Sequence, residues 1–347
     1  MTIEFEVANF QKNGKAVLQL LHTGFPEIRN TSNGTLEHLL WKYTGGVQSH
    51  SVVGLLDKNL VSFYGIINLP YIIDGEEILI GLVTDVMTHP DARRMGLFEK
   101  TGRATLALLK QTNVDCVLGY PIRQDVMPGH LKVGWHESFK LPVYVKGVRS
   151  KHIDGSLTRF RRSMFFLLML LNFKSLRSLK HGRYKVLDVS SFINDESFSS
   201  YLKDDLSSER GLVKSKEFLK WRLSRPGVEY KFIVVENNNS HGYAVVRINE
   251  LLGVHTLCVV DFLSQSKETL KTLHQAIDEY ATTTKVQLVA ICTNSENAKA
   301  IQLGRNGYVR THKFFRLIFN QISTKTQLIW FKSDENWAIY WIDSDTV

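Results

Sequence analysis

The chain has 347 residues, a length that suggests about two domains. Its content of 44% hydrophobic and 11% aromatic residues is ordinary for a folded soluble protein. Lysine and arginine total 43 against 34 acidic residues, and the net charge of +9 suits an anionic ligand. The charge is equally compatible with nucleic acid or a membrane surface, so it selects none of these partners.

The N-terminal stretch MTIEFEVANF contains early acidic residues and no apolar core, so it does not predict a signal peptide. We therefore expect a cytoplasmic protein. The three cysteines, Cys116, Cys258 and Cys292, are far apart and form no CxxC pair. Neither a disulfide framework nor a zinc site is expected, and no metal-ligand cluster or Walker loop is present in the sequence.

The first half predicts an ordered series of elements. A Leu/Trp/basic segment at 36–43 precedes a hairpin of apolar, β-branched runs at 51–56 and 60–69. A third strand, 78–86, ends near Asp85, and an amphipathic helix follows it. The apolar run at 114–121 is typical of a buried strand, and a short segment then ends at Gly134-Trp135.

The middle of the chain, 151–185, is basic and contains the apolar run MFFLLMLLNF at 164–173. Ten residues are too few to span a bilayer, which needs about 20. The run predicts a buried helix between domains. The alternative is an interfacial anchor, in which basic residues of 159–180 contact a membrane surface.

The second half repeats the order of the first. Its segment 216–223 carries Trp221, which lies 180 residues after Trp41. A hairpin at 231–248, a strand ending near Asp261, a helix, a strand at 286–293 and Gly307-Tyr308 follow in the same order. The offset between the matched residues drifts by only seven. The sequence therefore predicts two copies of one α/β unit.

This unit resembles the acetyltransferase fold of the GNAT superfamily, repeated in tandem over nearly the whole chain. The resemblance implies an α/β (α+β) fold of two mixed-sheet units. A GNAT domain with the acyl-CoA site is expected at 1–150, a basic linker with an apolar helix at 151–185, and a degenerate GNAT-like domain that shapes the acceptor site at 186–347.

The stretch from Arg93 to Phe98 resembles the acyl-CoA loop of this family, Arg/Gln-x-x-Gly-x-Gly/Ala, with Phe98 in place of the last small residue. Free N–H groups and the helix dipole favour an anion at a helix N-terminus, and Gly96 allows close approach of the backbone. The implied ligand is the pyrophosphate of coenzyme A. The resemblance assigns acyl-CoA binding to Val86, Thr88, Arg93, Arg94, Met95, Gly96, Leu97 and Phe98. The segment after Asp261 contains no such loop, so the second unit is expected to lack the site.

Two residues are candidates for catalysis. The family often places a tyrosine four residues before the Gly-aromatic pair to protonate the thiolate, and His130 occupies that position here. A histidine can give or take a proton near pH 7, although a helix histidine without a role is the alternative. Asp85 either orients the acceptor amine, or accepts its proton, or only satisfies backbone groups at the end of its strand.

Further residues are candidates for acceptor binding. By resemblance, Tyr120, Arg123 and Asp125 follow the fifth strand at the mouth of the acceptor site, and Trp135 lies close to them in sequence. The tail contains aromatic residues beside Asp343 and Asp345, which suits a sugar or nucleobase and equally suits an edge strand. The segment 218–230 and this tail resemble bacterial N-acyltransferases that act on dTDP-linked 3-amino-3,6-dideoxyhexoses.

The expected function is therefore transfer of an acetyl or hydroxybutanoyl group from acyl-CoA to the amine of a nucleotide-linked amino sugar, in the synthesis of lipopolysaccharide O-antigen or another surface polysaccharide. Small molecules rather than nucleic acid are the expected partners, with no transmembrane segment. One alternative is an aminoacyl-tRNA-dependent transferase that modifies a peptidoglycan precursor. Another is a non-catalytic ligand-binding protein of the same fold.

Overall fold

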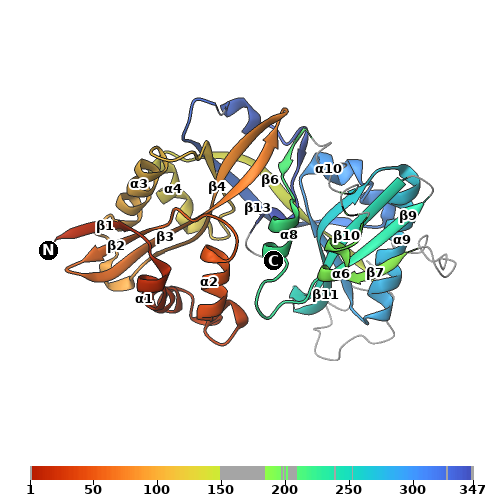
Figure 1. The fold of residues 1–347 in the computed structure, drawn as a ribbon, viewed down its shortest axis with the longest axis horizontal. Helices are drawn as coiled ribbons and strands as arrows, with labels where there is room; N and C mark the ends of the chain where they lie inside the picture. Colours follow the sequence, from red (N-terminus) through yellow and green to blue (C-terminus); the bar gives the residue numbers. More distant parts are fainter. Residues whose placement is uncertain are drawn as a thin grey trace. The chain divides into compact units, whose positions relative to one another are not determined.

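The computed structural model describes residues 2–148, 184–196, 198, 201, 209–237, 240–251, 253–325 and 327–344. The chain divides into two compact units (Figure 1). Unit 1 comprises Met1–Lys140, Glu209–Val228 and Phe315–Ser333, and unit 2 comprises Leu141–Ser208, Glu229–Phe314 and Asp334–Val347, so far as these ranges are described. Each unit contains one mixed sheet with helices packed on it.

Unit 1 contains a sheet in the order β1-β2-β3-β4-β5-β13. Its strands are β1 (Ile3–Val7), β2 (Val52–Leu56), β3 (Asn59–Ile73), β4 (Glu76–Thr88), β5 (Cys116–Gly119), the short β8 (Arg210–Leu212) and the second part of β13 (Val309–Gln321). Its helices are α1 (Phe10–Gly24), α2 (Leu36–Thr44), α3 (Leu97–Leu109), α4 (Met127–Val133) and α8 (Lys216–Arg222), with short 3₁₀ turns η1 (Pro26–Ile28), η2 (Ser32–Gly34), η3 (Pro90–Ala92), η4 (Gln124–Val126) and η6 (Leu328–Phe331).

Alternate residues of β3 pack against helices on opposite faces of this sheet, as the period of two in a strand requires. The Phe63 ring packs edge-on against Phe10 of α1 and Tyr43 of α2. The Tyr64 ring on the other face meets Phe98 of α3 and His130 of α4. Figure 1 shows the same division, with α1 and α2 on one side of the strands and α3 and α4 on the other.

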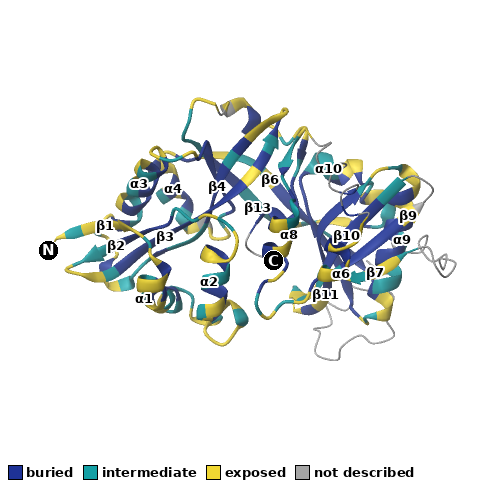
Figure 2. Cartoon of the chain, viewed as in Figure 1, coloured by how far each residue is buried: buried dark blue, intermediate teal, exposed yellow. Residues whose placement is uncertain are grey.

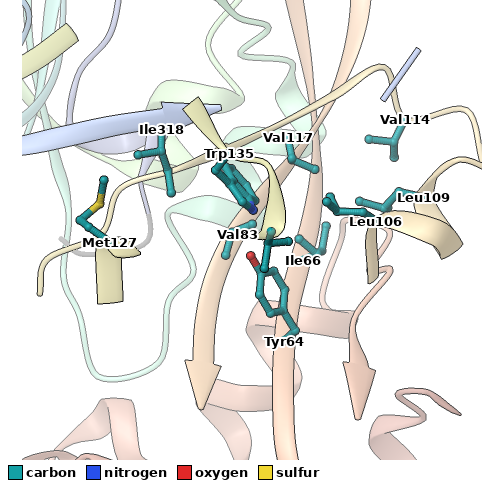
Figure 3. Packing of buried hydrophobic residues seen from close by; sticks show 11 residues of the cluster. Tyr64, Ile66, Val83, Leu106, Leu109, Val114, Val117, Met127, Trp135 and Ile318 are labelled. Carbon is teal, nitrogen blue, oxygen red and sulfur yellow. The ribbon is translucent and has the colours of Figure 1, made fainter. Parts of the chain in front are cut away.

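The core on the α3 and α4 face is built around Tyr64 and Trp135, which are 1% and 2% exposed. Aliphatic side chains of β4, β5, α3 and β13 pack around them, and Figure 3 shows the hydroxyl of Tyr64 directed toward the Trp135 ring. Helix α3 contributes Leu106 and Leu109 at helical spacing. The dark strands in Figure 2 mark this buried layer beneath partly exposed helices.

Unit 2 contains a sheet in the order β6-β12-β11-β10-β9-β7. Its strands are the second part of β6 (His136–Gly147), β7 (Lys185–Asp188), β9 (Lys231–Asn237), β10 (Ser240–Leu251), β11 (Val254–Ser264), β12 (Leu288–Cys292) and β14 (Trp337–Ala338). Its helices are α6 (Val189–Ile193), α9 (Lys267–Thr283) and α10 (Ser295–Ala300), with 3₁₀ turns η5 (Gly304–Asn306) and η7 (Trp341–Asp343).

Each half of the sequence supplies one strand to the sheet that the other half builds. Strand β13, from the second half, pairs antiparallel with β5, and Ile318 lies opposite Gly119. Asp115 holds this arrangement, because its carboxylate accepts hydrogen bonds from Leu79 N at 3.0 Å and Ser323 Oγ at 2.9 Å. The residues 141–147 of β6 pair antiparallel with β12.

The expected ranges 1–150 and 186–347 divide the chain at a single linker, whereas the compact units exchange strands across that division. The physical reason is the pairing of β13 with β5, a contact between residues about 200 positions apart that local sequence patterns do not encode. The apolar run at 164–173 and the basic segment 159–180 lie outside the described residues.

The repeat predicted from Trp41 and Trp221 corresponds to a direct contact in unit 1. The two indole rings stack at 5.5 Å, and each Nε1–H donates to the backbone carbonyl of the other tryptophan at 2.8 Å. Such reciprocal bonds join equivalent positions of α2 and α8. The matched residues are therefore equivalent in structure as well as in sequence.

Candidate functional site

Strands β4 and β5 separate in unit 1. They pair in parallel from Ile80 with Cys116 to Val83 with Gly119, and β4 then continues to Thr88 without β5. A bulge lies at the point of separation, because Thr84 and Asp85 of β4 face the single residue Gly65 of β3. Bulges re-aim side chains and are frequent beside active sites.

The separation leaves one edge of β4 free beyond Val83. On its other edge, Val86 and Thr88 pair with Tyr64 and Ser62 of β3. Within the described ranges no strand pairs with β4 on the β5 side past Val83. The backbone groups on that edge therefore have room to bond an extended ligand. The acyl-CoA contacts predicted for Val86 and Thr88 fall on this segment of β4.

Helix α3 begins next to this free edge with an uncapped N-terminus. Gly96 is the N-cap residue, with a left-handed φ of +70° and no side-chain hydrogen bond to the first turn. A Cβ atom at Gly96 would meet nothing closer than the Lys100 side chain at 3.8 Å, so the space before the helix is open. The first amides of an α-helix have no internal acceptor, and this end of the helix favours an anion.

Some residues around Gly96 are exposed to solvent, and others are buried in the core of unit 1. Arg93 and Arg94 are exposed, and Met95 is half-buried. Leu97 is 1% exposed and packs with Val61 and Ala92, which fixes the start of the helix.

Phe98, which replaces the small residue of the family loop, is half-buried on the other side of the helix. Its ring lies 5.0 Å from the His130 ring. The substitution therefore serves the packing of α3 on α4 and leaves the loop open.

The corresponding helix of unit 2, α9, is capped by its own side chains. Ser266 Oγ accepts from the amide of Thr269 at 3.2 Å, and Thr269 Oγ1 accepts from the amide of Ser266 at 3.1 Å. This capping box bonds the amides of Thr269 and Ser266 to side chains, whereas Gly96 has no side chain that could cap α3. The difference agrees with the expectation that the second unit lacks the loop.

The C-terminal tail of unit 2 lies where β11 and β12 separate. Their parallel pairing ends at Val259 with Ile291, and Thr293, just after β12, bridges to Tyr340 and donates to the carbonyl of Ile339 at 2.8 Å. Residues of the tail are almost fully buried here: Trp337, Ile339, Tyr340, Trp341 and Ile342.

Asp343 is 0% exposed and accepts from the amide of Tyr340 at 2.8 Å, so the structure places it as a cap within the tail rather than at a surface. Asp345 lies outside the described residues.

Asp85 stands at the bulge of β4 in contact with two residues, Lys42 and Tyr43, that are not among the candidates predicted from sequence. Its Oδ2 accepts from Lys42 Nζ at 3.0 Å and from the Tyr43 hydroxyl at 2.8 Å. Tyr43 also lies 2.6 Å from Thr84 Oγ1. The Asp85 side chain is 23% exposed, whereas that of Lys42 is 7% exposed. The available signal was the spacing of Leu39, Lys42 and Tyr43 on the buried face of one short helix.

His130 lies inside unit 1 at 4% exposure, packed edge-on against Phe98 and Trp135. Its Nδ1 is 3.3 Å from the Tyr64 hydroxyl. Burial lowers the pKa of His130 to about 4, so the imidazole is neutral at pH 7. Burial raises the pKa of the Tyr64 hydroxyl well above its usual value, so that group also stays neutral.

The acceptor candidates differ in exposure. Arg123 and Asp125 are exposed and form an ion pair with each other at 2.5 Å. Each partner shifts the other, because this hydrogen bond lowers the pKa of Asp125 and raises that of Arg123. Tyr120 is 7% exposed, and Trp135 is a core residue. The exposed ion pair is thus the group of this set that a ligand can reach directly.

No group of three or more histidine, cysteine or acidic side chains in the described part of the chain could hold a metal ion. All three cysteines are buried as free thiols. Within the same part, no helix is both long enough and apolar enough to cross a bilayer.

Comparison with known families gives a match at the same residues that form this site. Residues 11–136 match the model of the acetyltransferase (GNAT) domain. This match lies within the first half of the chain. The match confirms the expected GNAT-type N-acyltransferase, and a GNAT fold implies acyl-CoA as the donor substrate. No curated protein matches the sequence.

Solved structures share the fold over more than nine-tenths of the chain. A probable N-acyltransferase of Enterococcus faecalis V583 superposes with a TM-score of 0.66 at 12% identity, over 93% of this chain and 73% of that one. A GCN5-related N-acetyltransferase from Anabaena variabilis gives 0.61 at 13% identity, over 93% and 73%. A tandem GNAT protein from the clavulanic acid biosynthesis pathway gives 0.57 at 12% identity, over 93% and 99%. These likenesses confirm the expected tandem α/β fold.

Proposed function

We propose that the chain transfers an acyl group from acyl-CoA, bound by unit 1, to the amine of a nucleotide-linked amino sugar. The observation that carries the donor site is the uncapped N-terminus of α3 at Gly96, next to the free edge of β4. Unit 2 has a capped helix and a filled separation at the corresponding positions. These differences support a single donor site in unit 1.

Different residues of unit 1 would bind different parts of the acyl-CoA donor. The backbone amides from Met95 to Phe98 would hold the pyrophosphate, and the exposed guanidinium groups of Arg93 and Arg94 would add charge-assisted hydrogen bonds. The free edge of β4 would bond the extended pantetheine chain through the backbone of Val86 and Thr88. The thioester would then lie toward the bulge at Asp85.

The chemistry at that point is attack of a neutral amine on the thioester carbonyl. The nitrogen lone pair forms the C–N bond, the C–S bond breaks, the ammonium proton leaves the nitrogen, and the thiolate gains a proton. Backbone N–H groups directed at the developing oxyanion are typically worth about 3 kcal/mol. Alignment of amine and thioester supplies much of the remaining acceleration.

His130 is proposed as the proton donor to the thiolate on sequence grounds. Since its imidazole is buried and neutral, this role requires the ring to become protonated or to pass on a proton from the Tyr64 hydroxyl. The pH dependence of kcat in His130→Gln tests the assignment: a profile that matches the wild type removes His130 from the mechanism.

The identity of the acceptor rests on the sequence. The resemblance of segment 218–230 to acyltransferases of surface polysaccharide synthesis favours a dTDP-linked 3-amino-3,6-dideoxyhexose, and the net charge of +9 suits two anionic substrates. Arg123 and Asp125 are the proposed contacts, while the burial of Asp343 and Trp135 points to structural roles for those two. We expect the reaction to take place in the cytoplasm.

A thermal-shift comparison tests both substrates. Acetyl-CoA, hydroxybutanoyl-CoA, free CoA and dTDP are added separately to the full chain. Ligands that bind the native state raise its melting temperature in proportion to ln(1 + [L]/Kd). Stabilisation by both the CoA compounds and dTDP supports the proposal. Stabilisation by the CoA compounds alone contradicts the proposal that the acceptor is a nucleotide-linked sugar. Stabilisation by none of the four compounds supports a non-catalytic protein.

A further inference from the structure

We propose that Lys42 and Tyr43 are positioning residues for the acyl transfer, which fix Oδ2 of Asp85 so that Oδ1 accepts a hydrogen bond from the attacking amine. This inference rests on the proposed function, because it assumes that the acceptor nitrogen reaches the bulge of β4. It adds a requirement on the acceptor: the group that meets Oδ1 must carry a hydrogen-bond donor, as a neutral amine does.

The two carboxylate oxygens of Asp85 have different surroundings: Oδ2 is bonded to the protein, and Oδ1 is proposed to meet the ligand. Both recorded hydrogen bonds, from Lys42 Nζ and the Tyr43 hydroxyl, go to Oδ2. Among the residues that the structure describes, none donates to Oδ1. The side chain stands two residues beyond the last β4–β5 pair and is 23% exposed. A carboxylate held by one oxygen presents the other in a fixed direction.

The position of the Tyr43 hydroxyl is built into the sheet. A Cβ atom on Gly65, the residue of β3 opposite the bulge, would lie 2.1 Å from that hydroxyl. Glycine inside a strand weakens it and often marks a site where another group approaches closely. The Tyr43 ring is held as well, because it stacks on Phe10 at 4.5 Å and 6°. The glycine therefore makes room for the contact with Thr84 and Asp85.

The buried ammonium of Lys42 fixes the position of the Asp85 carboxylate. An ion pair in which one partner is almost fully buried cannot lose the other partner without a large penalty, so the Asp85 side chain stays in place. Asp85 then orients a neutral amine and leaves the departing proton to water.

The second half of the chain provides an internal comparison. Asp261 occupies the matching position of β11, two residues beyond the last β11–β12 pair, and accepts from the Tyr243 hydroxyl at 3.0 Å. It is 0% exposed. In the sequence repeat, Arg222 matches Lys42 and Leu223 matches Tyr43. The second half therefore has no hydroxyl group at the position of Tyr43. A partly exposed aspartate at this position is therefore a feature of unit 1, since Asp261 is fully buried.

The test is a pair of matched substitutions, Tyr43→Phe and Tyr243→Phe, each of which removes one hydroxyl bonded to an aspartate. The probes are acetyl-CoA and dTDP-3-amino-3,6-dideoxyglucose, with release of the free CoA thiol as the readout. We expect Tyr43→Phe to lower kcat/KM for the amine about tenfold, the loss typical of one hydrogen bond to a charged group, with the Kd of CoA unchanged. Tyr243→Phe should retain the wild-type kcat/KM.

A second variant, Lys42→Met, removes the charge and should lower kcat/KM for the amine by more than Tyr43→Phe, again with unchanged CoA affinity. Wild-type values in Tyr43→Phe, or equal losses in both tyrosine variants, overturn the inference while the proposed function stands. Weakened CoA binding in Tyr43→Phe also overturns it, since the residue would then be a general structural support. If the wild type acylates no amine, the proposed function and this inference fall together.

Discussion

Substitution of Gly96 by valine should have two effects that can be measured separately: backbone strain, seen in the melting temperature, and loss of the anion site, seen in the Kd of CoA. Gly96 has a φ of +70°, and a left-handed conformation costs a residue with a Cβ about 1–2 kcal/mol. In a unit of this size, we expect the melting temperature to fall by about 3 °C per kcal/mol. Since the nearest atom to a new Cβ is 3.8 Å away, the protein itself accommodates the side chain.

The loss of affinity comes from the ligand side. A valine at the N-cap keeps the pyrophosphate away from the first amides of α3, and each hydrogen bond to a charged group is worth about 1.5–3 kcal/mol. Loss of one such bond raises the Kd of CoA roughly 10- to 100-fold. Isothermal titration calorimetry with free CoA measures this change directly.

Gly75 provides the matched control. It has a φ of +86° in the turn between β3 and β4, and a Cβ there would meet nothing within 4 Å. Gly75→Val should therefore lower the melting temperature by a similar amount and leave the Kd of CoA unchanged. Equal CoA affinities in the two variants would refute the reasoning, because the ligand would then not depend on the N-terminus of α3.

Three further outcomes follow from the same structure. Alanine at Arg93 or Arg94 should weaken CoA binding about fivefold at low salt and flatten its dependence on ionic strength, as titrations at two salt concentrations will show. Burial lowers the pKa of His130 in the folded state to about 4 from its usual 6.5, so the unfolded chain binds more protons and the free energy of unfolding falls as the pH drops from 6.5 to 4. At pH 5, His130→Gln should lose about 2 kcal/mol less of this free energy than the wild type, as measured by urea titration. Trp221→Phe deletes the bond to the Trp41 carbonyl and should lower the free energy of unfolding by about 1 kcal/mol in the same assay.

Local sequence patterns predicted the repeated unit well, because a strand, a hairpin and a helix N-terminus leave signatures within a few residues. The match of Asp85 with Asp261 corresponds to equivalent positions beyond the last pair of two parallel strands. The loop around Gly96 likewise stands between a strand and a helix, as the motif indicated.

The remaining features depend on contacts between distant residues. Lys42 and Tyr43 reach Asp85 across 43 and 42 positions of the chain, and no local pattern encodes that meeting. His130 occupies the family position expected from spacing, but its burial among aromatic rings is a property of the packed core. The tail suited a sugar or nucleobase site and equally an edge strand in sequence, and the structure buries Asp343 as a cap within it.

The exchange of β6 and β13 means that the gene cannot be divided at its linker into two independent modules. A fragment ending near residue 150 would lose the residues 315–321 that cover β5, and it would expose that strand as an unpaired edge. The complementary fragment would lose the segment 141–147 that covers β12. The polypeptide must be synthesised past residue 292 before the strands of the unit 2 sheet are all present, and past residue 321 before those of the unit 1 sheet are. This order favours late folding of unit 1 during translation.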